Sequence, residues 1–188
     1  MNNIGASVRA RLLNVAKAQG ADFNQVLVRF ALERTGYRLS QSEHADHFLL
    51  KGALLFTLWY DMPHRATRDA DLPAPRLRTY PVYTVVAEKR HAIALLGMTN
   101  SRMKDYLDLS VLLDRETLDI DLLAQALKAT FERHGMAVPA ELPVGVTDEF
   151  AHDSSRQALW QAFIKKNELA HESLPSIVDR LRVALGQR

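Results

Sequence analysis

Residues 65–81 read RATRDADLPAPRLRTYP, and this stretch decides how the chain is divided. It holds three prolines and has no sustained helical period, which predicts an extended or loop-like segment with one short strand near residues 67–72. Directly after it, residues 82–96 carry apolar side chains at helical spacing. We therefore expect two parts, residues 1–80 and residues 81–188, and the second is expected to be a helical region.

The composition is typical of a globular protein and excludes disorder. Of the 188 residues, 47% are hydrophobic, 24% are charged and none is cysteine. Without cysteine there are no disulfides, thiolate zinc sites or cysteine nucleophiles, so any catalysis must use carboxylates, His, Lys, Ser or Thr. No apolar run approaches the roughly 18 residues that cross a bilayer, and the N-terminus lacks a signal-peptide core. We expect a cytoplasmic protein with no membrane contact.

Charge is distributed unevenly along the chain. Residues 1–94 hold 13 Lys and Arg against 8 Asp and Glu, whereas residues 95–188 hold 11 against 14. A basic half can attract partners that carry phosphate. Because there is no dense run of Lys or Arg, the charge alone does not predict nucleic-acid binding.

The apolar spacing predicts a mostly helical chain with one buried strand. Helices are expected at residues 6–18, 22–34, 82–96, 102–113, 121–134, 148–166 and 174–185. Asp22 should cap the second helix, Gly36 should end or weaken it, and its buried side chains should be Phe23, Val26, Leu27 and Phe30. Residues 47–51 indicate a buried strand that leads through Gly52 into a helix at residues 53–60.

Asp69 and Asp71 form the first feature that could carry chemistry. Alternate residues of a strand point to the same face, so both carboxylates would converge on one side, as Mg²⁺ binding requires. Two metal ions in such a site can hold the attacking and leaving oxygens of a phosphoryl transfer. The alternative is a solvated turn in which these carboxylates pair with Arg65 and Arg68.

Lys51 and Gly52 lie where the expected strand ends and the next helix begins. Glycine lets the backbone approach a phosphate closely, and the N-terminus of the following helix offers free N–H groups. The alternative is that Gly52 only makes the turn.

Two further motifs lie on the expected helices at residues 82–96 and 102–113. Lys89 follows Val85 and Val86 by one helical turn, so its charge either extends to solvent or points into a cleft toward a phosphate or carboxylate. Asp105 and Asp108 share one helix face, and Lys104 can pair with Asp108. This face is either a salt-bridged surface or the rim of a polar cleft.

The whole series of motifs, in this order along the chain, is a more specific signal than any single motif. The series is Lys51-Gly52, then RATRDAD at residues 65–71, then Glu88-Lys89 with Ala92, then RMKDYLDL at residues 102–109. From residue 48 to residue 113 it resembles the AbiEii/AbiGii-type nucleotidyltransferase toxins, a branch of the polymerase-beta-like nucleotidyltransferase superfamily. The resemblance implies transfer of a nucleotide from an NTP to an acceptor such as tRNA, within a bacterial type IV toxin–antitoxin (abortive infection) system that has a cognate antitoxin encoded nearby.

The resemblance also implies roles for particular residues. Lys51, Gly52 and Lys89 would bind the nucleotide, and Asp69 and Asp71 would be catalytic carboxylates that bind Mg²⁺. The further acidic group of the site would come from Asp105 and Asp108. Such machinery is adequate in principle, because in-line nucleotidyl transfer needs little covalent help from the protein.

One departure from the family pattern changes the expectation. Only nine residues, 72–80, separate Asp71 from Pro81, whereas the family fold needs at least two more strands there, one of which bears a third carboxylate. A smaller departure is Ala53, where many relatives have Ser or Gly. We predict an α+β, mostly helical fold with a truncated nucleotidyltransferase-like core, a sheet of about two strands and a C-terminal helical bundle.

The missing strands also change the expected stability and transferase activity. An incomplete sheet leaves an exposed edge and predicts low stability, and the missing carboxylate predicts weak or absent transferase activity. Three functions stay open at this point. The chain is a minimal nucleotidyltransferase toxin, a catalytically inactive remnant of one, or a helical module that contacts nucleic acid or protein.

Overall fold

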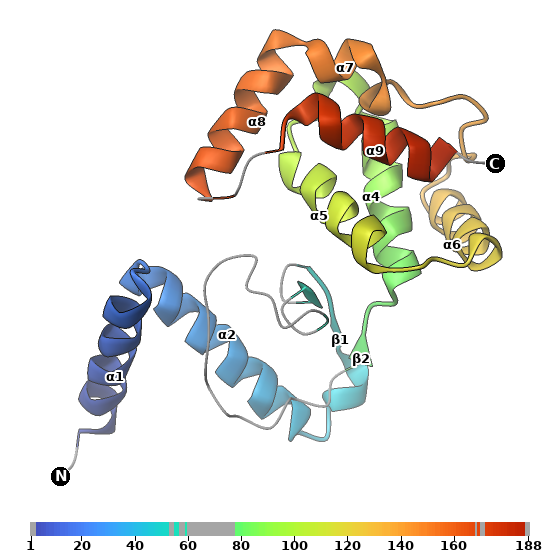
Figure 1. The fold of residues 1–188 in the computed structure, drawn as a ribbon. Coiled ribbons are helices and arrows are strands. Elements are labelled where there is room, and N and C mark those ends of the chain that lie inside the picture. The colour runs from blue at the N-terminus through green and yellow to red at the C-terminus, as the bar shows by residue number, and fades with distance from the viewer. Residues whose placement is uncertain are drawn as a thin grey trace. The chain divides into compact units, whose positions relative to one another are not determined.

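The computed structural model describes residues 3–52, 55–56, 59, 78–167, 169 and 172–186. The chain divides into two compact units, Met1–Tyr80 (unit 1) and Pro81–Arg188 (unit 2) (Figure 1). The expected fold class is confirmed, because the described residues form mostly helices together with a two-stranded sheet.

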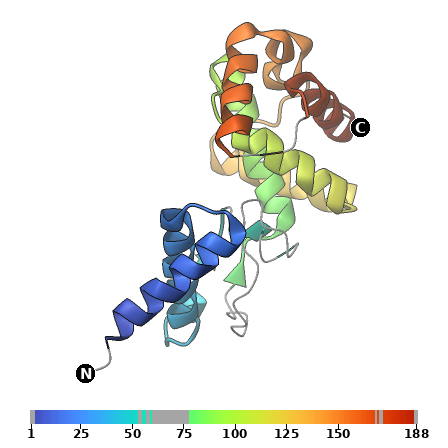
Figure 2. The ribbon, with the colours of Figure 1, turned by 60° about the vertical axis from the view of Figure 1, so that its left-hand side comes forward.

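Unit 1 opens with two helices, α1 (Ile4–Gln19) and α2 (Phe23–Ser40), which pack against each other (Figure 2). The expected cap is confirmed, since the side chain of Asp22 accepts a hydrogen bond from the backbone N–H of Gln25 at 3.1 Å. Each helix buries one residue, Ala16 in α1 and Val26 in α2. Most of the surface of both helices is therefore open in the described part of the chain.

Two expectations for α2 are wrong. The helix continues through Gly36 to Ser40, because a single glycine costs only about 1 kcal/mol relative to alanine and does not by itself end a helix. Leu27 is 41% exposed, although the apolar spacing placed it in the core. Phe23 and Phe30 are half-buried. Spacing identifies the apolar face of a helix but not what covers it.

The sheet is shorter than expected. After the 3-10 turn η1 (Ala45–His47), strand β1 (Leu49–Leu50) pairs in parallel with β2 (Arg78–Thr79). The expectation of a buried strand over residues 47–51 is wrong in its length and its burial, since Leu49 is 44% exposed. Strand β2 lies inside the nine-residue gap and was not predicted, because two residues are too few to show an alternating pattern.

Parts of two expected elements lie outside the described residues. Leu55, Phe56 and Trp59 are helical, as expected for residues 53–60, whereas the other residues of that segment beyond Gly52 are not described. The expected strand near residues 67–72 also lies outside the described residues.

Unit 2 is a helical bundle. Its elements are α4 (Val82–Leu96), η2 (Gly97–Thr99), α5 (Met103–Arg115), α6 (Ile120–Arg133), η3 (Val144–Val146), α7 (Asp148–His152), α8 (Ser154–Lys166) and α9 (Leu174–Gly186). In Figure 1, α6 packs on α4 and α9 packs on α5. The expected helices at residues 82–96, 102–113, 121–134 and 174–185 are confirmed. The single helix expected at 148–166 is wrong, because Asp153 ends α7 and caps α8.

The core of unit 2 draws on all of its α-helices. Its side chains with 2% exposure or less include Val86, Ile93, Met103, Tyr106, Leu109, Leu112, Leu127, Phe131, Phe150, Trp160, Ile164, Leu174, Ile177, Val178 and Leu181. Gly145 of η3 enters this core, where a Cβ atom would lie 2.7 Å from Cγ2 of Ile93 and 3.0 Å from the hydroxyl of Tyr106. The hydroxyl of Tyr106 donates a hydrogen bond to the backbone oxygen of Gly145 at 2.9 Å. The close approach of η3 to α4 and α5 therefore requires glycine.

Candidate functional site

Four charged residues meet between α4 and α5, and we call them the α4–α5 charge cluster: Lys89, Arg102, Asp105 and Asp108. Nζ of Lys89 lies 2.8 Å from Oδ1 of Asp105 and 2.6 Å from Oδ2 of Asp108. Nε of Arg102 lies 2.8 Å from Oδ2 of Asp105. The structure thus brings together three residues that the sequence motifs placed in the site.

The local sequence explains why this cluster is buried. Val85 and Val86 lie in the core, so the stem of Lys89 one turn later crosses apolar surface, and its side chain is 14% exposed. Asp105 lies in the first turn of α5, where the helix dipole favours a carboxylate, and is 1% exposed. Two cations and two carboxylates leave the cluster without net charge. A carboxylate this deeply buried is stable only with such partners.

Asp108 differs from Asp105 in its access to solvent, because its side chain is 19% exposed. Spacing within α5 allows a pair between Asp108 and Lys104, but the carboxylate of Asp108 pairs with Lys89 of α4. Packing of α5 on α4 therefore decides this pairing rather than spacing within α5.

The other expected site residues lie in unit 1. Gly52 has φ +86°, a backbone conformation that favours glycine, and the backbone N–H of Leu55 donates to its oxygen at 3.0 Å. Nζ of Lys51 lies 5.7 Å from the centre of the Tyr80 ring, in a cation–π contact. Lys51 and Gly52 are both exposed. Both residues of the turn are thus accessible to solvent.

Asp69 and Asp71 lie outside the described residues. Within the described part of the chain, no group of three His, Asp or Glu side chains could hold a metal ion. The carboxylates of the α4–α5 charge cluster are already matched by Lys89 and Arg102. The donor chemistry that suits Mg²⁺, paired hard oxygens without neighbouring cations, is therefore not offered by this cluster.

Two residues near the cluster were not predicted. Asn100 is fully buried, and its side-chain oxygen accepts a hydrogen bond from the backbone N–H of Arg102 at 2.9 Å. Arg156 of α8 donates to the backbone oxygen of Asn100 at 3.0 Å. An Asn shortly before a helix is a capping signal that could have identified Asn100. No local pattern identifies Arg156, because its contact depends on how α8 packs.

His91 lies two residues after Lys89 and packs toward α6. Its ring stacks on His134 at 4.3 Å and meets the edge of Phe131 at 5.0 Å. Burial and the neighbouring His134 lower the pKa of His91, with smaller opposing and reinforcing effects from Glu88 and Arg133. The neutral form of His91 is therefore the one that the folded state favours.

This lowered pKa predicts how stability depends on pH. The unfolded chain binds the His91 proton more tightly than the folded chain does. The stability that neutral His91 contributes is therefore complete above the ordinary histidine pKa of about 6.5, and it is lost as the pH falls below that pKa. We expect the urea midpoint to fall between about pH 7.5 and about pH 5.5, and to fall less in His91→Phe. An equal fall in both proteins would contradict the prediction.

Comparison with known proteins assigns the chain to a family. A family model described as nucleotidyl transferase AbiEii toxin, type IV TA system, matches residues 37–73 and 71–183. This chain belongs to the AbiEii nucleotidyltransferase toxin family. The resemblance seen in the motifs is thereby confirmed. No curated protein and no solved structure matches the chain.

The AbiEii match is in two pieces that overlap at residues 71–73. This break adjoins the segment 72–80, where the sequence predicts that strands of the family fold are missing. Membership in a type IV toxin–antitoxin family implies a nucleotide substrate and a cognate antitoxin. Among the described helices of this AbiEii member, none is both long and apolar enough to cross a membrane.

Proposed function

We propose that this AbiEii-family chain transfers a nucleotide from an NTP to a hydroxyl of an RNA acceptor such as tRNA, at a low rate. The observation that carries the proposal is Lys89 held between Asp105 and Asp108, in a chain that matches the AbiEii family over both sides of the D-x-D motif. A lysine ammonium that two carboxylates hold in one direction is suited to bind a triphosphate.

In the proposed reaction, the acceptor hydroxyl oxygen attacks the α-phosphorus of the NTP. A new phosphorus–oxygen bond forms, the bond between the α- and β-phosphates breaks, and pyrophosphate leaves. The hydroxyl proton passes to water. Mg²⁺ bound by Asp69 and Asp71 would supply charge compensation for the phosphates.

We expect Lys89 to contact the nucleotide through its ammonium group. An ammonium group has three N–H donors, and Lys89 directs two of them to Asp105 and Asp108. In the proposed complex the third donates to a phosphate oxygen. Asp105 is too deeply buried to touch a substrate and would hold Lys89 in place, whereas the more exposed Asp108 lies nearer to solvent.

The low rate follows from the short connection between Asp71 and Pro81. The strand that carries the third carboxylate of the family has no room in residues 72–80, and the structure shows only the two-residue strand β2 within the described part of that segment. One acidic group that would balance the metal charge or accept the proton is then missing.

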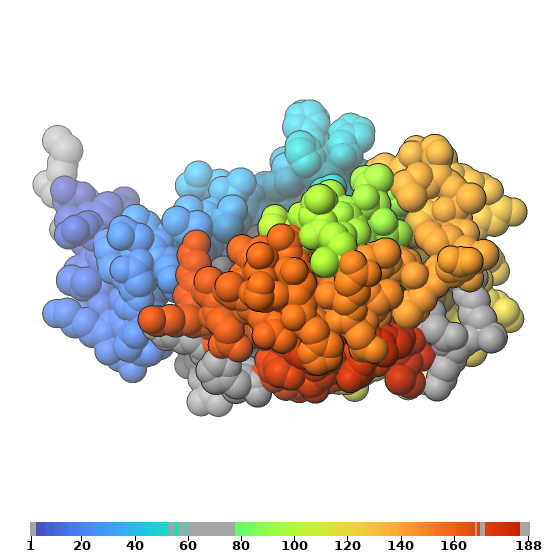
Figure 3. Space-filling model, turned by 90° about the horizontal axis from the view of Figure 1, so that it is seen from above, coloured from blue at the N-terminus to red at the C-terminus, as the bar shows by residue number. Residues whose placement is uncertain are grey.

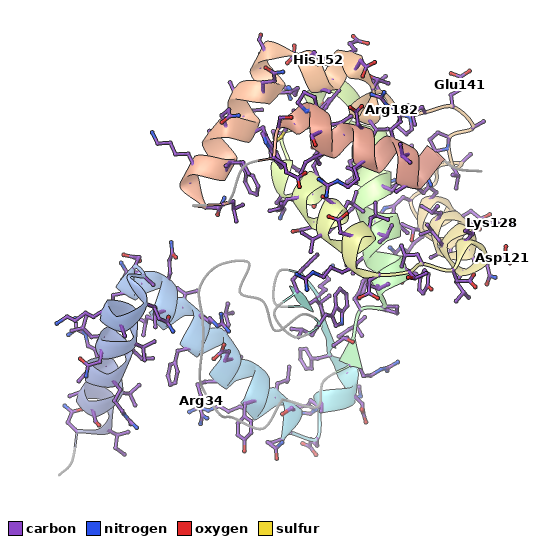
Figure 4. All side chains as sticks on the ribbon, viewed as in Figure 1. Arg34, Asp121, Lys128, Glu141, His152 and Arg182 are labelled. Carbon is purple, nitrogen blue, oxygen red and sulfur yellow. The ribbon has the colours of Figure 1, made fainter. Side chains whose placement is uncertain are left out.

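A transfer assay with labelled NTPs, Mg²⁺ and bulk tRNA tests this proposal. We expect slow incorporation of label that requires Mg²⁺ and is lost in Asp69→Ala and in Asp71→Ala. Asp121→Ala is a matched control, since Asp121 is an exposed carboxylate of α6 (Figure 4). This control should keep the activity of the unchanged protein.

Two outcomes would contradict the proposal. Rapid transfer that is lost in Asp69→Ala would show that the missing strands do not impair the enzyme. If neither transfer nor Mg²⁺-dependent NTP binding occurs, the chain is an inactive remnant. Binding is best followed by thermal stability, because a ligand that binds only the folded state raises the unfolding temperature.

A further inference from the structure

A line of polar contacts runs from the start of α8 to the α4–α5 charge cluster. Arg156, in the first turn of α8, donates from Nη1 to the backbone oxygen of Asn100 at 3.0 Å. The side-chain oxygen of Asn100 accepts from the backbone N–H of Arg102 at 2.9 Å, and Arg102 pairs with Asp105. In Figure 3, the light green chain between α4 and α5 lies beside the orange residues of α7 and α8. The contacts thus connect helices that are far apart in sequence.

The polar groups in this line are buried at a cost. Asn100 is 0% exposed, and its Nδ2 is buried without a hydrogen bond of ordinary geometry among the described residues, as are Nε of Arg156 and Oδ2 of Asp105. A buried polar group without a full set of hydrogen bonds is destabilising. The side-chain oxygen of Asn100 caps the start of α5 through the backbone N–H of Arg102. Burial of the remaining polar groups beside that cap is a cost that the cap itself does not explain.

We propose that Asn100 and Arg156 are positioning residues for the nucleotide site. They hold Arg102 in place, Arg102 forms an ion pair with Oδ2 of Asp105, and Asp105 directs the Lys89 ammonium through Oδ1. The inference rests on the proposed function, in which the remaining N–H of Lys89 meets a phosphate oxygen. Loss of either positioning residue would let Arg102 move away, and Lys89 would lose its fixed direction.

Arg182 of α9 provides a matched control within the same unit. Its Nε donates to the backbone oxygen of Val146 at 3.0 Å, and its Nη2 pairs with Asp148 at 2.7 Å (Figure 4). A hydrogen bond from Arg182 lowers the pKa of the Asp148 carboxyl. Arg156 makes the same two kinds of contact, to a backbone oxygen and to an aspartate. Nη1 of Arg182 also lies 3.4 Å from Oδ1 of Asp179. Arg182→Gln therefore removes contacts of the same kinds, all from residues outside the α4–α5 charge cluster.

The first test is nitrogen-15 NMR of the Lys89 ammonium in the full chain, assigned by its loss in Lys89→Met. A lysine ammonium held by two carboxylates exchanges its protons slowly and gives an observable signal. We expect Arg156→Gln and Asn100→Ala to broaden this signal, Arg156→Lys to restore it in part, and Arg182→Gln to leave it unchanged. Urea unfolding of each variant confirms that it is folded. Should Arg156→Gln fail to fold, Asn100→Ala takes its place in the comparison with Arg182→Gln.

The second test is kinetic. We expect the KM for the NTP to rise between about tenfold and about a hundredfold in Arg156→Gln, with a smaller change in kcat, and to stay unchanged in Arg182→Gln. Equal Lys89 signals and equal KM values in these two variants would overturn the proposal. If the unchanged protein neither binds NTP nor transfers nucleotide, the proposed function fails, and the NMR comparison still decides whether Asn100 and Arg156 position Lys89.

Discussion

Lys89→Met is expected to lower the free energy of unfolding of unit 2 by about 3 to 5 kcal/mol, because it removes one of the two cations beside the buried carboxylate of Asp105 and the cation paired with Asp108. Methionine keeps the length and apolar packing of the lysine stem, so the loss isolates the charge. The double variant Lys89→Met/Asp105→Leu should be more stable than Lys89→Met alone. Replacing both members of a buried ion pair by apolar side chains costs far less stability than removing one member. Urea unfolding at neutral pH measures both effects.

Lys128→Met is the control for this prediction. Nζ of Lys128 lies 3.9 Å from a carboxylate oxygen of Glu132, but the two side chains are 75% and 63% exposed (Figure 4). Solvent screens such a pair, so its removal should leave the urea midpoint almost unchanged. If Lys89→Met were as mild as Lys128→Met, the α4–α5 charge cluster would not stabilise unit 2, and its role as a fixed nucleotide site would lose its support.

Phe131→Ala is expected to have an effect of similar size, about 3 to 5 kcal/mol, through the loss of apolar packing. Phe131 is fully buried and forms a cluster with Ala87 and Leu127 where α6 packs on α4. Its ring also contacts His91. The cavity left by alanine would lie directly behind the helix that carries Lys89. Fluorescence of the buried Trp160, in a Trp59→Phe background, reports the unfolding of unit 2.

Phe131→Leu and Leu122→Ala are the comparison variants for this prediction. Leucine fills much of the ring's volume, so Phe131→Leu should be clearly milder than Phe131→Ala. Leu122 lies on the same helix but is 49% exposed, so its truncation removes little buried surface. Equal losses in Phe131→Ala and Leu122→Ala would show that the α4–α6 contact does not contribute to the stability of unit 2.

Sequence reasoning was most accurate in unit 2, where long helices pack on one another. Helix α4 has the bounds expected from its apolar spacing, because Val85, Val86 and Ile93 all face a core that neighbouring helices complete. In unit 1 the same kind of pattern predicted buried positions such as Leu27 that are exposed. Spacing reports which side chains share a face, whereas burial depends on partners from elsewhere in the chain.

In the candidate site, too, the sequence predicted which residues take part but not the contacts between residues that are far apart in the chain. Motif spacing selected Lys89, Asp105 and Asp108, and it correctly placed both aspartates on one helix face. It allowed a pair between Asp108 and Lys104, which is close in sequence, whereas Asp108 pairs with Lys89, which is 19 residues away. Arg156 contacts Asn100 from 56 residues away, a separation at which no local pattern operates.

Gly145 limits how this site can vary among related sequences. Any side chain at position 145 would collide with Ile93 of α4 and Tyr106 of α5, both of which lie next to the helix segments that carry Lys89 and Asp105. A substitution there would force η3 or the two helices to shift, and a shift of α4 or α5 would move the ammonium or the carboxylate although neither had been changed. A relative that keeps every charged residue of the motifs but has lost this glycine is therefore expected to have a disrupted site.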